Sequence, residues 1–457
     1  MADSLGLGDA ARIHVVGAGG SGMSGITKLM SQRGHVVSGS DLKPGRALDA
    51  LGDLGIETWV GHAPDRIADV DLVVASSAVP ERDTELAAAR TAGVPVWSRP
   101  DFLDALTTEI STIGFAGTHG KTTSTALAVT ALRAAGHDPT FLLGGELSDL
   151  NTGAHLGAGT RLLLEADEAY GTFRRLHLEG LVVTNIEADH LDYYGNVATL
   201  EEAFALVANR VRGPVLGCLD DPGVRRLAER ARVIGYGTSA QAQWRITDLA
   251  HGDGHVVFTL TGPTAATTVR VPRPGDHMAR NAAGVLALLS ELGYSLEAAA
   301  RGLATFGGVR RRFEVRARIA GVTVVDDYAH HPTEIAATIA AGRLGGWTRV
   351  WAVFQPHRYT RTADLAPEFG GPLAAADHVM VTDVYAAGEA PMPGVSGRLV
   401  AEAVAAAGGD VDYVPSLGDV PSALVPQLQA GDLVLLLGAG DVTTLAEPIA
   451  RSLEAAR

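Results

Sequence analysis

Residues 111–123 read STIGFAGTHGKTT, and this stretch decides the fold of the middle of the chain. The strand-like run STIGFA is followed by Gly117, Gly120 and Lys121, and then by the helical pattern TALAVTALRAAG. Glycines let backbone N–H groups wrap phosphates at a helix N-terminus, and a lysine there reaches the outer phosphates of a nucleotide. The loop is shorter than the usual phosphate loop, because Phe115 stands where its first glycine would be. We predict a phosphate loop here, with Thr122 placed to ligate magnesium.

A second glycine motif follows the strand-like run RIHVVGAG at residues 12–19. Gly17, Gly19 and Gly22 form G-x-G-x-x-G before the helical pattern MSGITKLM, and Asp41 ends the next apolar run. Such glycines let a helix N-terminus approach a diphosphate, and an acid at this distance can bind a ribose. The motif alone does not separate NAD from another nucleotide diphosphate. A tight turn without a ligand is the alternative.

Strand-like runs alternate with helical patterns along all 457 residues, which predicts an α/β protein with mostly parallel sheets. We expect three domains: a Rossmann-like domain at 1–107, a phosphate-loop domain at 108–318 and a second Rossmann-like domain at 319–457. Stretches at 243–248 and 255–271, separated by GDG, predict an antiparallel hairpin in the second domain. The remaining strand runs are at 35–41, 71–78, 94–98, 161–167, 181–186, 214–219, 321–328, 349–357, 378–385 and 432–440.

Two of the central runs end in carboxylates and a histidine. RLLLEADE (161–168) places Glu165 and Asp167 on one face of a strand, so both can point at a metal. TNIEADHLDYYG (184–195) ends with Asp189, His190 and Asp192. Helix capping is the alternative reading of these acids. With a phosphate loop close by, we predict a metal site that includes Glu165 and His190.

The third domain carries two polar clusters after strand-like runs. VTVVDDYAHHPTE (322–334) contains Asp326, Asp327, His330 and His331, and VFQPHRYTRT (353–362) contains His357, Arg358 and Arg361. Ligands gather at the carboxyl ends of parallel strands, so we expect both clusters to line one cleft. Solvated loops are the alternative, as a solvated interdomain run is for Arg310, Arg311 and Arg312.

Composition excludes several classes of protein. The net charge of −15 argues against nonspecific nucleic-acid binding. A single cysteine, Cys218, excludes an internal disulfide framework. No apolar run approaches the ~18 to 20 residues of a membrane span, and the N-terminus lacks an apolar signal core. We therefore expect a cytoplasmic protein that uses neither nucleic acid nor membrane as a partner.

Taken together, the motifs resemble the Mur ligase family over nearly the whole chain. The resemblance rests on GAGGSGMSGI, GTHGKTT, EADE, TNIEADHLDYYG, FGGVRRRFE, DDYAHHPTE, FQPHRYTRT and DVYAAGEAP. It implies a UDP-sugar-binding domain, an ATP-binding domain and a C-terminal domain that closes over the site. It also implies ATP and Mg²⁺ as cofactors, and amide-bond formation through an acyl phosphate in peptidoglycan precursor synthesis.

The last three of these segments look most like the branch of the family that joins L-alanine to UDP-N-acetylmuramic acid. The branch that recycles murein tripeptide is the nearest alternative. An NAD-dependent oxidoreductase would leave GTHGKTT unexplained, and a noncatalytic nucleotide-binding module is the remaining alternative. We expect a monomer or a homodimer.

The resemblance implies a role for individual residues. The UDP-sugar would bind to Gly17, Gly19, Gly20, Ser21, Gly22, Asp41, Ser76 and Ser77. ATP would bind to Gly117, Thr118, His119, Gly120, Lys121, Thr122, Thr123, Asn281 and Arg312. The metal would be held by Thr122, Glu165 and His190, and the amino acid by His331, His357, Arg358 and Arg361. Lys121, His190, His331 and Arg358 would be the catalytic residues.

The chain departs from the family pattern at four positions. Ala169 and Tyr170 stand where Ser and Asp are usual, Met278 replaces an Asn, and Asp83 replaces an Asn.

Overall fold

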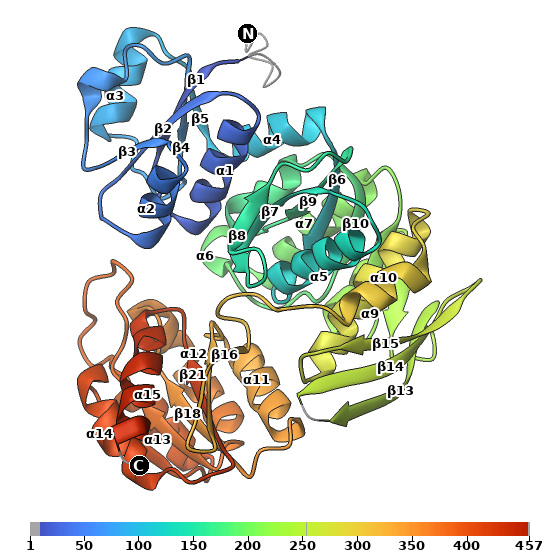
Figure 1. The fold of residues 1–457 in the computed structure, drawn as a ribbon, viewed down its shortest axis with the longest axis vertical. Helices are drawn as coiled ribbons and strands as arrows, with labels where there is room; N and C mark the ends of the chain where they lie inside the picture. Colours follow the sequence, from blue (N-terminus) through green and yellow to red (C-terminus); the bar gives the residue numbers. More distant parts are fainter. Residues whose placement is uncertain (1–9, 253, 456–457) are drawn as a thin grey trace. The chain divides into compact units, whose positions relative to one another are not determined.

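The computed structural model describes residues 10–252 and 254–455, and its chain divides into two compact units. The first unit comprises residues up to 247 together with 259–269 and 280–306. The second comprises 248–258, 270–279 and 307 onward. The α/β class is as predicted: three separate sheets, all mostly parallel, carry the helices (Figure 1). The predicted boundaries near 107 and 318 stay a prediction.

The N-terminal sheet has five parallel strands in the order β3-β2-β1-β4-β5. Its central strand β1 is buried at four of five residues, as a strand covered on both faces should be. The strands are β1 (Arg12–Val16), β2 (Val36–Asp41), β3 (Glu57–Val60), β4 (Leu72–Ala75) and β5 (Val96–Ser98). The helices are α1 (Ser21–Gln32), α2 (Arg46–Asp53), α3 (Thr84–Ala92) and α4 (Arg99–Glu109).

The central sheet has ten strands in the order β15-β14-β13-β12-β11-β10-β6-β9-β7-β8. Strands β10, β6 and β9 lie side by side and parallel, so the three strand ends that carry predicted site residues share one edge. The strands are β6 (Ser111–Ala116), β7 (Thr140–Leu147), β8 (Thr152–His155), β9 (Arg161–Glu165), β10 (Leu178–Val183), β11 (Val215–Cys218), β12 (Ile234–Gly237), β13 (Trp244–Gly252), β14 (His255–Thr261) and β15 (Ala266–Val271). Asp253, in the predicted hairpin turn, lies outside the described residues.

The helices that follow these strands cover the sheet, and α5 packs on β7 and β9 (Figure 1). They are α5 (Lys121–Ala134), the short 3-10 segment η2 (Ala169–Arg175), α6 (Leu191–Tyr194), α7 (Val197–Arg210), α8 (Pro222–Ala228), α9 (Asp276–Glu291) and α10 (Leu296–Leu303).

The C-terminal sheet has six strands in the order β16-β17-β21-β18-β19-β20, and only β16 runs antiparallel to its neighbour. In β21 (Asp432–Leu437), Leu433, Leu435 and Leu437 pack in one core cluster, and the residues between them pack in another. This alternation shows that helices cover both faces of the sheet.

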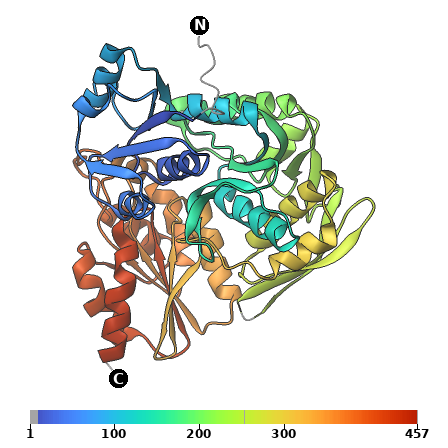
Figure 2. The same cartoon turned by 45° about the horizontal axis from the view of Figure 1, so that its top comes forward.

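The other C-terminal strands are β16 (Glu314–Ile319), β17 (Val322–Asp327), β18 (Arg349–Phe354), β19 (His378–Val381) and β20 (Val411–Tyr413). The helices are α11 (Pro332–Leu344), α12 (Tyr359–Ala374), α13 (Arg398–Ala406), α14 (Val420–Leu424) and α15 (Ala446–Ala455). Helix α15, red in Figures 1 and 2, packs on β16 and β17. Within the described part of the chain, none of the helices has both the length and the apolar character that crossing a membrane requires.

Candidate active site

The predicted phosphate loop lies between β6 and α5, and its binding of phosphate stays a prediction. Gly117 and Gly120 have φ angles of 131° and 86°, which L side chains rarely adopt. A Cβ atom on Gly117 would lie 2.1 Å from Thr184 Oγ1, so glycine is required there for space as well. The loop is braced from the end of β10. The Asn185 side chain accepts from the His119 N–H at 2.8 Å and donates to the His119 carbonyl at 3.0 Å.

Lys121 is the first residue of α5, and its ammonium group is enclosed by oxygen atoms. Nζ donates to both carboxylate oxygens of Glu168 at 2.8 Å and to the Gly117 carbonyl at 2.8 Å. Burial alone would lower the pKa of Lys121, but the carboxylates of Glu168 and Asp167 outweigh it and raise the pKa. The lysine therefore stays positively charged in the loop that is predicted to bind phosphates.

The predicted metal ligands fall into two neighbouring sets. Thr122 lies near Glu165, whose carboxylate accepts from the Gly144 N–H at 2.6 Å. His190 lies with Asp167 and Glu168, in a group whose donor atoms are all within 4.8 Å of one another. Carboxylate oxygens with one imidazole suit a hard or borderline divalent cation. The residues thus fit Mg²⁺, and the set of Thr122, Glu165 and His190 stays a prediction. The side chain of Asp192 is not described.

Asn281 reaches the phosphate loop from α9. Its side chain is 6% exposed, and its Oδ1 atom lies 2.9 Å from where a Cβ on Gly120 would be. Next to it, Arg280 Nε donates to Asp220 at 2.9 Å. The structure therefore brings Asn281 to the loop from more than 150 positions away in the sequence.

The N-terminal glycine turn has the expected form. Gly17 has a φ angle of 81°, and Gly20 directly precedes α1. A Cβ on Gly17 would lie 3.0 Å from the Cβ of Ser76, which brings the predicted serine segment against the turn. Asp41 accepts from the Gly19 N–H at 3.0 Å, so its carboxylate holds the turn itself. These contacts do not test whether Ser77 binds the sugar. The side chain of Ser21 is not described.

The two polar clusters of the C-terminal domain lie next to each other, and that they line one cleft stays a prediction. The rings of His330 and His357 are 5.9 Å apart, and His357 stacks on Tyr385 at 5.7 Å. Arg361 Nη1 lies 3.4 Å from His357 Nδ1. Arg358 precedes α12 with a φ angle of 71°, and its N–H donates to the Tyr385 carbonyl at 2.8 Å. The segment DVYAAGEAP therefore helps to position the arginines.

His331 and Arg312 are placed by the start of α11. His331 caps this helix: its Nδ1 accepts from the Thr333 N–H at 3.4 Å. Arg312 lies 3.8 Å from Glu334 and stacks over the Tyr328 ring at 5.1 Å.

Asp326 and Asp327 act as anchors of the fold. Asp327 accepts from the Phe313 and Ala329 N–H groups, each at 2.8 Å. Asp326 is fully buried and accepts from the Thr443 hydroxyl at 2.5 Å. Our expectation that these two acids line a cleft is therefore wrong, because both carboxylates are buried inside the domain.

Glu168, Thr184 and Asn185 contact the loop but were not predicted as site residues, although all three lie within the motifs EADE and TNIEADHLDYYG. Each follows the end of a central strand next to the phosphate loop. Their position directly after a buried strand was the signal that could have indicated a site role. Their pairing with Lys121 or His119 could not be predicted, because it depends on the order of strands in the sheet.

We predict that the second unit loses stability in mild acid because of two histidines. Burial lowers the pKa of His330 to about 4 and that of His357 to about 4, whereas an unfolded histidine titrates near ~6.5. Between these values the unfolded state binds more protons, so the free energy of unfolding falls as the pH drops. Burial raises the pKa of Asp327 to about 6, which opposes the trend.

The free energy of unfolding should be measured by urea denaturation at several pH values between 4 and 6.5. It should fall less steeply with decreasing pH in His330→Gln/His357→Gln than in the wild type. His137→Gln, an exposed histidine of the first unit, is the matched control. Equal slopes for the double variant and the wild type would contradict the prediction.

Known proteins are similar to this chain in both sequence and fold. Three family models match: "Mur ligase family, catalytic domain" at 12–110, "Mur ligase middle domain" at 115–289 and "Mur ligase, glutamate ligase domain" at 311–440. A curated UDP-N-acetylmuramate–L-alanine ligase of Mycolicibacterium vanbaalenii is 44% identical, over 97% of this chain and 96% of its own.

Two solved structures are similar as well. The UDP-N-acetylmuramate–alanine ligase of Thermotoga maritima superposes with a TM-score of 0.84 at 27% identity, over 98% of this chain and 100% of its own. A murein peptide ligase of Psychrobacter arcticus shares the fold with a TM-score of 0.71 at 22% identity, over 97% of this chain and 99% of its own. Its matches to the family models and its full-length relatives place this chain in the Mur ligase family.

Proposed function

We propose that this chain is an ATP-dependent ligase that forms an amide bond between L-alanine and the carboxylate of UDP-N-acetylmuramic acid. The observation that carries the proposal is the charged, partly buried Lys121 in the predicted phosphate loop, next to Asp167, Glu168 and His190. Similarity to full-length ligases of this substrate pair supports it. We place the activity in the cytoplasm, where ATP is available.

The reaction has two steps in this proposal. The carboxylate oxygen of the sugar attacks the γ-phosphorus of ATP, and the bond to ADP breaks to leave an acyl phosphate. The alanine nitrogen then attacks the acyl carbon, phosphate leaves, and the amine loses a proton. Phosphoryl transfer depends mainly on positioning and charge neutralisation, which Lys121 and the backbone N–H groups of the loop provide.

Magnesium, when bound, would add positive charge at the phosphate oxygens. Thr122, Glu165 and His190 are the residues that we propose hold it, with Asp167 beside them. The glycine turn from Gly17 to Gly22 would hold the UDP diphosphate.

The recycling of murein tripeptide is the second candidate, since a ligase of that type has the same fold. Phosphate release should be measured with UDP-N-acetylmuramic acid, ATP and one acceptor at a time: L-alanine, glycine, L-serine or murein tripeptide. The proposal requires L-alanine to be the best acceptor. Glycine or serine can retain some activity, because one small group gives only ~1 to 3 kcal/mol of discrimination.

We predict that Lys121→Ala nearly abolishes ATP turnover and leaves binding of the UDP-sugar intact. Losing one preorganised charge at the transferring phosphate should cost ~3 kcal/mol or more in the transition state. The substitution also leaves Glu168 buried without its partner, which destabilises the fold.

The double variant Lys121→Ala/Glu168→Gln separates the two effects. It should regain thermal stability without regaining turnover. If turnover returns together with stability, the lysine has a structural role only and the phosphate-loop assignment fails.

We predict that turnover requires a divalent cation and that Glu165→Ala and His190→Ala raise the concentration of Mg²⁺ needed for half-maximal rate. Each variant removes one ligand, while the phosphate loop stays intact. A Mg²⁺ titration of initial rates measures the shift. Asp138→Ala is the control, because Asp138 is a partly exposed acid just before the start of β7. Full activity in the presence of a chelator would refute the metal assignment.

We predict that Arg358→Lys and Arg361→Lys raise the Michaelis constant for L-alanine far more than that for ATP. A guanidinium holds a carboxylate through two parallel hydrogen bonds, and an ammonium group cannot reproduce this geometry. Arg343→Lys is the matched control, because Arg343 is bound to Asp377 and the Ala375 carbonyl on the surface of the same unit.

Steady-state kinetics against all three substrates tests this assignment. If turnover falls while the Michaelis constant for alanine stays constant, the arginines neutralise phosphate and do not bind the amino acid.

A further inference from the structure

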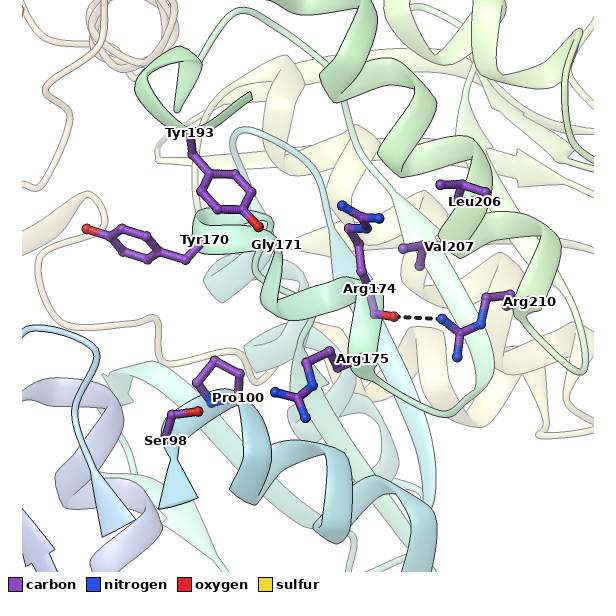
Figure 3. Close-up of a pocket in the computed structure, with 10 residues that line it drawn as sticks. All are labelled: Ser98, Pro100, Tyr170, Gly171, Arg174, Arg175, Tyr193, Leu206, Val207 and Arg210. Atoms are coloured by element: carbon purple, nitrogen blue, oxygen red, sulfur yellow. Dashed lines mark hydrogen bonds between the residues drawn. The ribbon is translucent and has the colours of Figure 1, made fainter. Parts of the chain in front are cut away.

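Positive φ angles at residues other than glycine occur beside the proposed site residues of both units. Tyr170, two positions after Glu168, has φ 53° and lines the pocket in Figure 3, where Gly171 follows it with φ 68°. Arg358 has φ 71° at the position just before α12, and neither of its neighbours is a glycine. A side chain makes such a conformation strained, so it persists only where other contacts hold it. For Arg358, these contacts come from a distant segment.

The segment after β19 supplies the first of these contacts. The Arg358 N–H donates to the Tyr385 carbonyl, and the Tyr385 N–H donates to the Pro356 carbonyl, each at 2.8 Å. The His357 ring stacks on the Tyr385 ring, with 5.7 Å between their centres and 14° between their planes. The two segments therefore pair like short parallel strands, and this pairing fixes the backbone that leads into α12.

The start of α12 takes its cap from the same distant segment. The first N–H groups of a helix need acceptors from outside it, and the arginine that precedes α12 has no acceptor in its side chain. Glu389 replaces the missing cap: Oε2 accepts from the Thr360 N–H at 3.0 Å, and Oε1 accepts from the Thr360 hydroxyl at 2.7 Å. A carboxylate at this end of a helix also interacts favourably with the helix dipole.

The charge of Glu389 suits this position. Burial alone would raise the pKa of Glu389, but the hydrogen bonds from Thr360 and the positive charge of Arg358 outweigh it and lower the pKa. Arg361 lies in the first turn of α12, where its Nη1 atom is 3.4 Å from His357 Nδ1. An ionised carboxylate is therefore bound to the same helix start that carries two guanidinium groups.

We propose that Glu389 is a positioning residue for the amino-acid substrate, because it caps α12 and thereby fixes the guanidinium groups of Arg358 and Arg361. The inference rests on the proposed function, in which these two arginines bind the carboxylate of L-alanine. Arg358 stands directly before the helix and Arg361 in its first turn, so fraying of this turn would displace both groups. A small displacement of a group that binds the substrate is enough to weaken its contribution.

Steady-state kinetics of three variants tests the proposal. Glu389→Ala should raise the Michaelis constant for L-alanine about tenfold, the scale of one charge-assisted hydrogen bond. Turnover and the Michaelis constant for ATP should stay within about twofold, because the arginines would bind alanine equally in the ground and transition states. Glu389→Gln keeps an oxygen that can accept from the Thr360 N–H, so it should restore most of the loss. Glu368→Ala, which removes an exposed acid of the same helix, is the matched control and should change none of these constants.

Hydrogen exchange tests the cap without using the reaction. Amide groups of residues 359–362 should exchange faster in Glu389→Ala than in the wild type, whereas Glu389→Gln and Glu368→Ala should exchange like the wild type. Thermal melting of all three variants shows whether each one is folded. If the wild type does not use L-alanine, the proposed function is at fault. The exchange measurement then still tests the cap, and the kinetics are repeated with the acceptor that the wild type uses.

Three results would overturn the proposal. Unchanged exchange in Glu389→Ala would show that the carboxylate does not hold the helix start. Faster exchange with an unchanged Michaelis constant for the acceptor would show a cap that has no effect on the substrate. An equal rise in the Michaelis constants for the acceptor and for ATP would show a general disturbance of the fold.

Discussion

The enclosure of one ammonium group organises the centre of the first unit. Lys121 is the only lysine beyond residue 43, and its side chain is 14% exposed, so its charge requires an opposite charge close by. Glu168, with 1% exposure, supplies it. The Glu168 carbonyl is in turn fixed by the Tyr194 hydroxyl at 2.6 Å. The loops that follow β6 and β9 are therefore tied to a single cation, and Tyr194 of α6 supports its partner.

This constraint also explains why the phosphate loop keeps its shape. The loop carbonyl of Gly117 bonds to the lysine, and its His119 peptide group bonds to Asn185. Backbone groups of Gly117, Thr118 and His119 are thus satisfied by protein atoms. Because such a loop is already ordered, phosphate binding does not have to offset an entropic cost of ordering it.

The sequence predicted the buried strands well because strands covered on both faces read as apolar runs, as β1, β17 and β21 do. It missed six strands. Four of them, β3, β8, β16 and β20, lie at the edges of their sheets, and the other two are β7 and β12, which each contain two glycines. The α/β class and the family resemblance are confirmed. The order of strands was out of reach, because it depends on contacts between distant segments.

The same limit applies to the candidate site. Residues at strand ends could be singled out, but their partners could not, since Asn281 reaches Gly120 and Thr443 reaches Asp326 only through the fold. Asp326 and Asp327 show the consequence. The sequence pattern of a carboxylate at a strand end is the same whether the carboxylate binds a ligand or a backbone N–H. The roles of the individual site residues remain predictions.

Burial affects the positive charge of arginine and histidine differently in this acidic chain. A guanidinium stays protonated in almost any environment, whereas an imidazole loses its proton when it is desolvated. In the second unit, Arg361 lies beside His357, and burial lowers the pKa of both His357 and His330. Positive charge there resides on the arginines, which suit a carboxylate or a phosphate. Because their pKa values are lowered to about 4, the two histidines are neutral at pH 7 and add no positive charge to that of the arginines.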